Sequence, residues 1–198
     1  MGKSLELLGL ATFNIIIAII LSATFLKKSE EAISTLTTPH IEKFVNDITE
    51  ISGGIRKDMD SFEVTSYLMA HIANDSRFSS TIDYNMPDIS ESGERILELD
   101  KLHFISNTQQ GMKAFTRHEA AVKIDYIQIA DNGKSARVTT TSHERGVIPI
   151  EDNFGETQFF PVTGTSYCEQ KLVLSEESII QMAEAVCSTN IDFINSDF

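Results

Sequence analysis

Cationic residues, proline, glycine and cysteine are all scarce in this chain of 198 residues. Its 16 Lys and Arg stand against 29 Asp and Glu, which gives a formal net charge of -13 at pH 7. Because contacts to phosphates need clustered cations, this balance argues against a nucleic-acid-binding protein. The 10 Gly and 4 Pro are too few for a fibrous or low-complexity protein. The 2 Cys allow at most one internal disulfide and cannot alone build a four-cysteine zinc site.

One long hydrophobic run interrupts a composition that is otherwise typical of a soluble globular protein, with 41% hydrophobic and 23% charged residues. Residues 7–26 contain no charged side chain, and Lys27 and Lys28 follow them directly. A helix of this run is ~30 Å long at ~1.5 Å per residue, which matches the hydrocarbon thickness of a bilayer. The sequence therefore predicts contact with a membrane through residues 5–26.

Three interpretations of this run are open: an uncleaved signal anchor, a cleaved signal peptide and a buried core helix. A core helix would normally show a polar stripe. The best cleavage position follows Ala23, but Leu21 is a poor fit to the small residue expected three positions before the cut, which favours an anchor. The expected location is therefore the inner or plasma membrane with the domain outside the cytoplasm, or secretion after cleavage.

The remainder of the chain changes from helical to strand periodicity. A second helix is expected to begin at Asp60, where Glu63 completes a capping box. A turn is predicted at Asn132-Gly133, because this pair favours positive φ, and a β-bulge at Tyr126, where the side-chain alternation changes face. The expected elements are helices at 41–56, from 60 to 74–76 and at 94–115, and strands at 78–84, 121–129, 135–144, 157–162, 164–174 and 179–188.

Helices followed by a meander of strands predict an α+β fold, with about three helices packed on a curved antiparallel sheet. Cys168 and Cys187 fall on the last two strands. If those strands turn at 176–179, residues whose numbers sum to 355 lie opposite one another, and the two cysteines form such a pair. Opposite residues have Cα atoms ~4.5–5.5 Å apart, within disulfide range. A disulfide is therefore expected, whereas another turn register would leave two buried thiols.

The stretch 124–142, IDYIQIADNGKSARVTTTS, resembles the nuclear-transport-factor-2-like (cystatin-like cone) superfamily, in which a strand, an Asp/Asn-Gly turn and a strand opening with Ala-x-Val recur. The resemblance implies a cone-shaped domain at 41–188, which follows a membrane segment at 1–28 and a linker at 29–40 and precedes a tail at 189–198. It is compatible with membrane-anchored periplasmic secretion-assembly domains and with SnoaL-like domains. One fold hosts many functions, so neither branch settles the activity.

In such a cone a pocket lies between the helices and the concave sheet face. The candidates for lining it are the polar residues Asp83, Tyr84, His103 and Tyr126. His118 and His143 are further polar candidates, but both are expected to face solvent. No spacing singles out a catalytic pair or a metal-ligand motif, so no catalytic residue, metal or cofactor is assigned.

Two functions follow as hypotheses. The first is a membrane-anchored extracytoplasmic domain that binds other proteins, or further copies of itself, as an assembly component without catalysis. The second is a secreted or anchored small-molecule-binding domain with an isomerase-like or cyclase-like activity. An open apolar pocket with convergent polar groups would favour the second, and a cone filled by Phe and Leu would favour the first.

Overall fold

The computed structural model describes residues 33–54, 56, 58–85, 92–114, 116–151 and 157–194. The predicted membrane segment lies outside these residues. Within the described part, no helix is both long enough and apolar enough to cross a membrane. The chain divides into two compact units, Met1–Ile33 and Ser34–Phe198, and the second contains the helices and strands that follow.

The residues that the structure describes form three helices: α2 (Thr38–Ser52), α3 (Ser61–His71) and α4 (Lys101–Ala114). The capping box predicted for α3 is confirmed. The Asp60 carboxylate accepts hydrogen bonds of 2.8 Å from the backbone N–H groups of Phe62 and Glu63, and the Glu63 side chain accepts one of 2.8 Å from the backbone N–H of Asp60. Helix α2 begins earlier than predicted because Pro39 is accommodated in its first turn, where the missing N–H has no partner to lose.

Six strands form one sheet in the order β2-β1-β6-β5-β4-β3. Their bounds are β1 Ile72–Asn85, β2 Ser92–Leu99, β3 Thr116–Ile129, β4 Ser135–Glu151, β5 Thr157–Leu174 and β6 Ile180–Phe193. The prediction of a purely antiparallel sheet is wrong at one place, since β1 and β6 pair in parallel. That pairing joins the first strand to the last, so no local turn signal reveals it.

Several element predictions also need correction. The second helix, α3, ends at His71, so residues 72–76 belong to β1, and β6 continues to Phe193 into the predicted tail. Residues 94–99 form most of β2 and not the start of a helix, because their apolar residues fit both a helical and an alternating pattern. The strands predicted at 157–162 and 164–174 are one continuous strand, β5.

The β3–β4 hairpin forms where it was predicted. Gly133 has a φ of 65°, and the register shift between Ile124 and Tyr126 is the predicted bulge. The chain enters the domain beside this turn, because the backbone N–H of Leu36 donates to Gly133 O (2.8 Å) and Lys134 Nζ donates to Ser34 O (2.9 Å).

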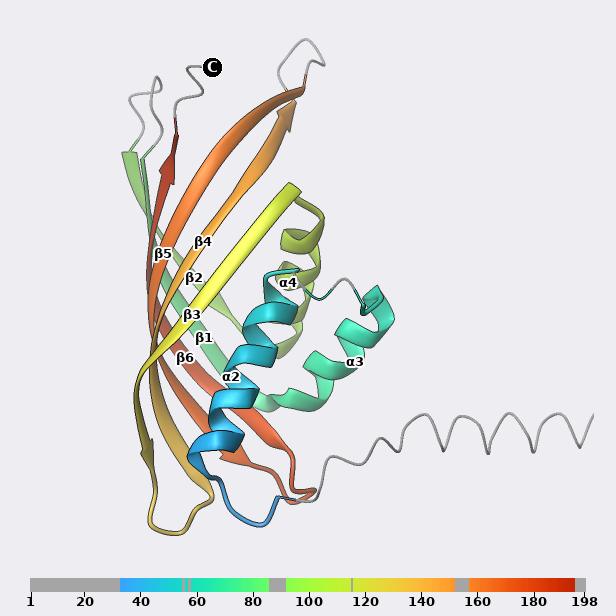
Figure 1. The fold of residues 1–198 in the computed structure, drawn as a ribbon, viewed down its shortest axis with the longest axis vertical. Coiled ribbons are helices and arrows are strands. Elements are labelled where there is room, and N and C mark those ends of the chain that lie inside the picture. The colour runs from blue at the N-terminus through green and yellow to red at the C-terminus, as the bar shows by residue number, and fades with distance from the viewer. Residues whose placement is uncertain are drawn as a thin grey trace, which may run out of the picture. The chain divides into compact units, whose positions relative to one another are not determined.

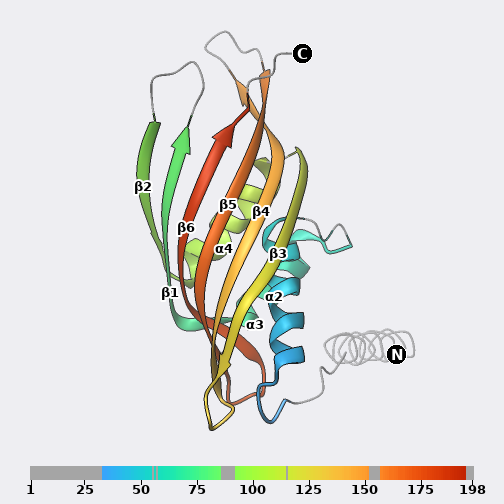
Figure 2. The same ribbon diagram turned by 60° about the vertical axis from the view of Figure 1, so that its left-hand side comes forward.

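The sheet is curved, and all three helices lie against its concave side (Figures 1 and 2). We call the end that holds the β3–β4 turn the closed end, because aliphatic side chains from both layers fill it. The largest fully buried side chains of the whole core between helices and sheet are Ile41, Ile51, Leu68, Ile72, Leu172, Val45, Val64 and Val138. At the opposite, open end, β4 and β5 extend past the helices (Figure 1).

Candidate functional site

The strand register decides which side chains face the helices. Val138 and Leu172 are buried, so even-numbered residues of β4 and β5 point to the concave side. Residues paired across neighbouring strands point to the same face. The odd-numbered residues near the end of β6 therefore also point to the concave side, as do the even-numbered residues of β1 that pair with them. The concave residues toward the open end are Ser80, Ile82, Tyr84, Cys187, Thr189, Ile191, Val162, Gly164, Ser166 and Glu144.

A pocket of 140 Å³ lies on this concave face toward the open end. Apolar side chains form much of its lining: Ile148, Val162, Ile191 and Phe193. Polar side chains from β3, β4, β5 and β6 also converge on it: His118, Glu144, Ser166 and Thr189. An apolar space with a few convergent polar groups is typical of a small-molecule site.

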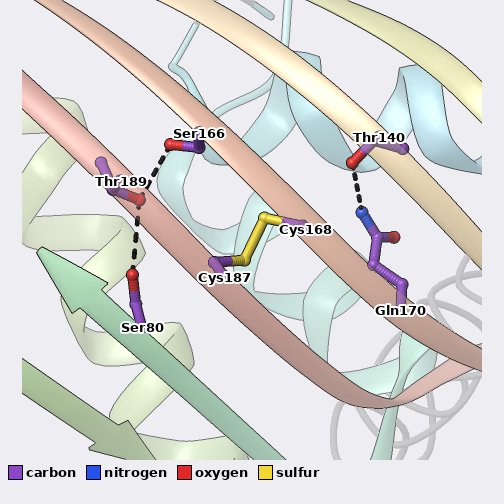
Figure 3. Close-up of a disulfide and its surroundings, with 7 residues drawn as sticks. All are labelled: Ser80, Thr140, Ser166, Cys168, Gln170, Cys187 and Thr189. Carbon is purple, nitrogen blue, oxygen red and sulfur yellow. Dashed lines mark hydrogen bonds between the residues drawn. A yellow bond between two sulfur atoms is a disulfide. The ribbon is translucent and has the colours of Figure 1, made fainter.

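Three hydroxyl groups form a chain across β5, β6 and β1 (Figure 3). Thr189 Oγ1 lies 2.9 Å from Ser166 Oγ and 3.4 Å from Ser80 Oγ, so it hydrogen-bonds on both sides. Three hydroxyls carry three hydrogens, and two hydrogen bonds use only two of them. One O–H donor therefore remains for a further acceptor, and both Ser166 and Thr189 line the pocket.

The predicted disulfide lies beside this hydroxyl chain (Figure 3). Cys168 and Cys187 face each other in the β5–β6 ladder with a Cα–Cα distance of 4.2 Å and an S–S distance of 2.08 Å. The predicted register holds as far as Lys171, beyond which an irregularity in the ladder shifts it by one residue. The cysteine pairing is correct because both residues lie on the open-end side of that shift.

His118 bridges two elements at the rim of the pocket. Its Nε2 lies 3.1 Å from Glu144 Oε2 on β4, and its Nδ1 bonds to the carbonyl oxygen of Gly53 at the end of α2. Both of these partners accept hydrogen bonds, so the arrangement favours an imidazolium that donates from both nitrogens. The hydrogen bond to Glu144 raises the pKa of His118 above its usual value, although burial opposes this. The negative end of the α2 dipole also favours a cation here.

The sequence prediction that His118 is exposed is wrong, because only 11% of its side chain is accessible. The carbonyl oxygen that bonds to its Nδ1 belongs to Gly53, which is 65 positions away in the chain. No local pattern around His118 indicates that contact.

Replacing His118 with Gln should make stability less dependent on pH. The pKa of His118 is higher in the folded than in the unfolded protein. The charged pair with Glu144 therefore stabilises the fold fully below the unfolded pKa of about 6.5, and this stabilisation is lost as pH rises through the folded pKa. The melting temperature of the wild type should therefore exceed that of His118→Gln most at about pH 6, and the difference should shrink toward about pH 9. Calorimetry across this range measures it, and a difference that does not change with pH would contradict the charged pair.

The four predicted pocket residues are not brought together. Asp83 and Tyr126 lie on the convex face, where Tyr126 is 58% exposed. The His103 side chain is 74% exposed and pairs with Asp100 at 2.9 Å beside the start of α4. Tyr84 alone among the four points to the concave side. The residues that do line the pocket were missed because face assignment on a strand depends on register and bulges.

In the described part of the chain, no group of three or more His, Cys, Asp or Glu side chains is arranged to hold a metal ion. His143, predicted to face solvent, is exposed, and its Nδ1 lies 3.1 Å from Thr165 Oγ1 on the convex face.

Helices against the concave side of a curved sheet form the cone that the resemblance to the nuclear-transport-factor-2-like superfamily implies, so the structure confirms that resemblance at the level of fold. No family model and no curated protein matches the chain.

Several solved structures are similar to it. A conserved protein from Planctomyces limnophilus is 15% identical with a TM-score of 0.47, over 78% of this chain and 99% of that one. A protein from Kribbella flavida is 10% identical with a TM-score of 0.49, and the match covers 75% of this chain and 87% of that one. A hexachlorocyclohexane dehydrochlorinase is 4% identical with a TM-score of 0.46, and the match covers 77% of this chain and 84% of that one. Such identities carry no activity or residue role to this chain.

Proposed function

We propose that this domain binds a small, mostly apolar molecule carrying a hydrogen-bond acceptor, in the pocket on its concave face. The observation that supports this most directly is the unused O–H donor of the Ser166–Thr189–Ser80 chain beside apolar walls. The pocket volume of 140 Å³ suits a single ring, since cavities of about 150 Å³ hold benzene. Aliphatic side chains fill the closed end, whereas the pocket lies toward the open end of the same concave face.

The proposed role is binding and not catalysis. A general base needs an unprotonated atom that faces the substrate. Both ring nitrogens of His118 already have acceptor partners, and Glu144 is one of those partners. The remaining histidine on the neighbouring strand, His143, lies on the opposite face of the sheet.

Binding of 4-fluorophenol and of fluorobenzene, followed by fluorine NMR, tests this function. Thr189→Val keeps the side-chain shape and removes the hydroxyl. It should therefore lower the affinity for 4-fluorophenol about 5- to 10-fold, which corresponds to the loss of one net hydrogen bond. Fluorobenzene, which has no hydroxyl, should be unaffected. Thr139→Val is the matched control, because Thr139 lies on the convex face of β4. Absence of binding by either probe, or equal losses for both, would contradict the proposal.

The domain is further proposed to lie outside the cytoplasm, held by its N-terminal segment or released after cleavage. The apolar run at 7–26 and the disulfide Cys168–Cys187 support this location, because disulfides persist mainly in oxidising compartments.

A further inference from the structure

We infer that the ligand of this pocket carries a carboxylate, which Arg95 binds at the β2 edge of the same concave face. The inference rests on the proposed function and adds the chemical class of the ligand: an amphipathic carboxylic acid with a compact apolar body.

Arg95 shares a row of the sheet with the pocket hydroxyls. It pairs with Ile82 on β1, Ile82 pairs with Thr189 on β6, and Thr189 pairs with Ser166 on β5. Paired residues point to the same face, so Arg95 lies on the concave side with Thr189. Two strand spacings of ~4.8 Å place the two Cα atoms about 10 Å apart, a distance that a small ligand and an arginine side chain can bridge together.

Among the residues that the structure describes, none offers a carboxylate partner to the Arg95 guanidinium. It lies over the Tyr84 ring, 5.9 Å from the centroid, and it makes no hydrogen bond or ion pair within the part of the chain that the structure describes. The nearest acidic residues along β1 and β2, Asp83 and Glu94, point to the convex face by strand alternation.

Tyr84 holds the guanidinium in place by a cation–π contact, which leaves its N–H groups available for a carboxylate. The sequence permits this arrangement through Gly93, since a Cβ at that position would lie 2.5 Å from Tyr84 Oη. Any other residue at 93 would displace the tyrosine on which Arg95 rests.

The surface between Arg95 and the hydroxyl chain is apolar. Ile82 and Leu97 lie on the concave side of β1 and β2, next to Ser80 and Arg95 along their strands. A ligand whose apolar body occupies the pocket would place its acceptor at Thr189 and would extend across Ile82 to bring its anionic group to Arg95. Arginine binds carboxylates in a bidentate manner and more strongly than it binds neutral acceptors.

The test compares 3-(4-fluorophenyl)propanoate with its neutral analogue 3-(4-fluorophenyl)propanamide by fluorine NMR. The wild type should bind the carboxylate about 10-fold more tightly than the amide, as expected for one charge-assisted hydrogen bond. Arg95→Met should abolish this preference and leave the amide affinity unchanged, while Arg95→Lys should retain part of it. Arg137→Met is the matched control, because it removes the same charge from the convex face of β4.

The outcomes separate the inference from the proposed function. Equal binding of carboxylate and amide by the wild type would overturn the inference and leave the pocket intact. A preference that survives in Arg95→Met but disappears in His118→Gln would also overturn it, since the carboxylate would then be bound by His118. Failure of both compounds and of 4-fluorophenol to bind would overturn the proposed function as well.

Discussion

Reduction of the Cys168–Cys187 disulfide is expected to lower the free energy of unfolding by about 3 kcal/mol. The two cysteines are 19 positions apart, and opening a loop of this length restores roughly that much conformational entropy to the unfolded chain. At about 2–4 °C per kcal/mol for a domain of this size, the melting temperature should fall by about 6–12 °C. Thermal unfolding followed by circular dichroism, with and without dithiothreitol, measures the change.

The double variant Cys168→Ser/Cys187→Ser is the control for this measurement. It should melt near the temperature of the reduced wild type and should not respond to dithiothreitol. A wild-type melting temperature that is insensitive to the reductant would show that the bond does not stabilise the fold. Mass spectrometry of protein isolated without reductant from its native compartment tests the location, because two free thiols would contradict export from the cytoplasm.

Leu172→Ala is expected to destabilise the domain by about 2–5 kcal/mol. The Leu172 side chain is 0% exposed on the concave face of β5, where the helices cover the closed end, so its removal leaves a cavity. Chemical denaturation measures the loss. Val186→Ala on β6 serves as the control: its side chain is 61% exposed, and the expected change is within about 0.5 kcal/mol.

The same variant separates the packed core from the pocket. Leu172 lies well along β5 from Val162 and Ser166, and it is not part of the pocket lining. Folded Leu172→Ala should therefore bind 4-fluorophenol as the wild type does. A parallel loss of binding would show that the open and closed ends of the cone are not independent.

The parts of the fold that were predicted correctly depend on local signals. The capping box at Asp60, the turn at Asn132-Gly133 and the bulge at Tyr126 each involve residues close together in the chain. The cysteine pairing was predictable for the same reason, since Cys168 and Cys187 belong to one hairpin. The parallel pairing of β1 with β6 was missed because it joins residues more than 100 positions apart, such as Phe78 and Ala185.

The site was harder to predict than the fold. Thr189 and Ser166 become pocket residues only when the faces of β5 and β6 are known, and a one-residue slip would turn them outward. Tyr126 was assigned to the pocket although its own bulge places it on the convex face. Arg95 fell within residues predicted as a helix, so its alignment with Thr189 across the sheet was not visible in the sequence.

Ligand binding in the concave pocket is the central feature of the proposed function. Backbone amide chemical shifts recorded during titration with 4-fluorophenol test it directly. We expect the largest changes at Ser166, Thr189 and Ile191, with small ones at Thr139 and Tyr167 on the convex face. Changes centred on Tyr167 and Val186, or none while the probe's own fluorine signal reports binding, would contradict it.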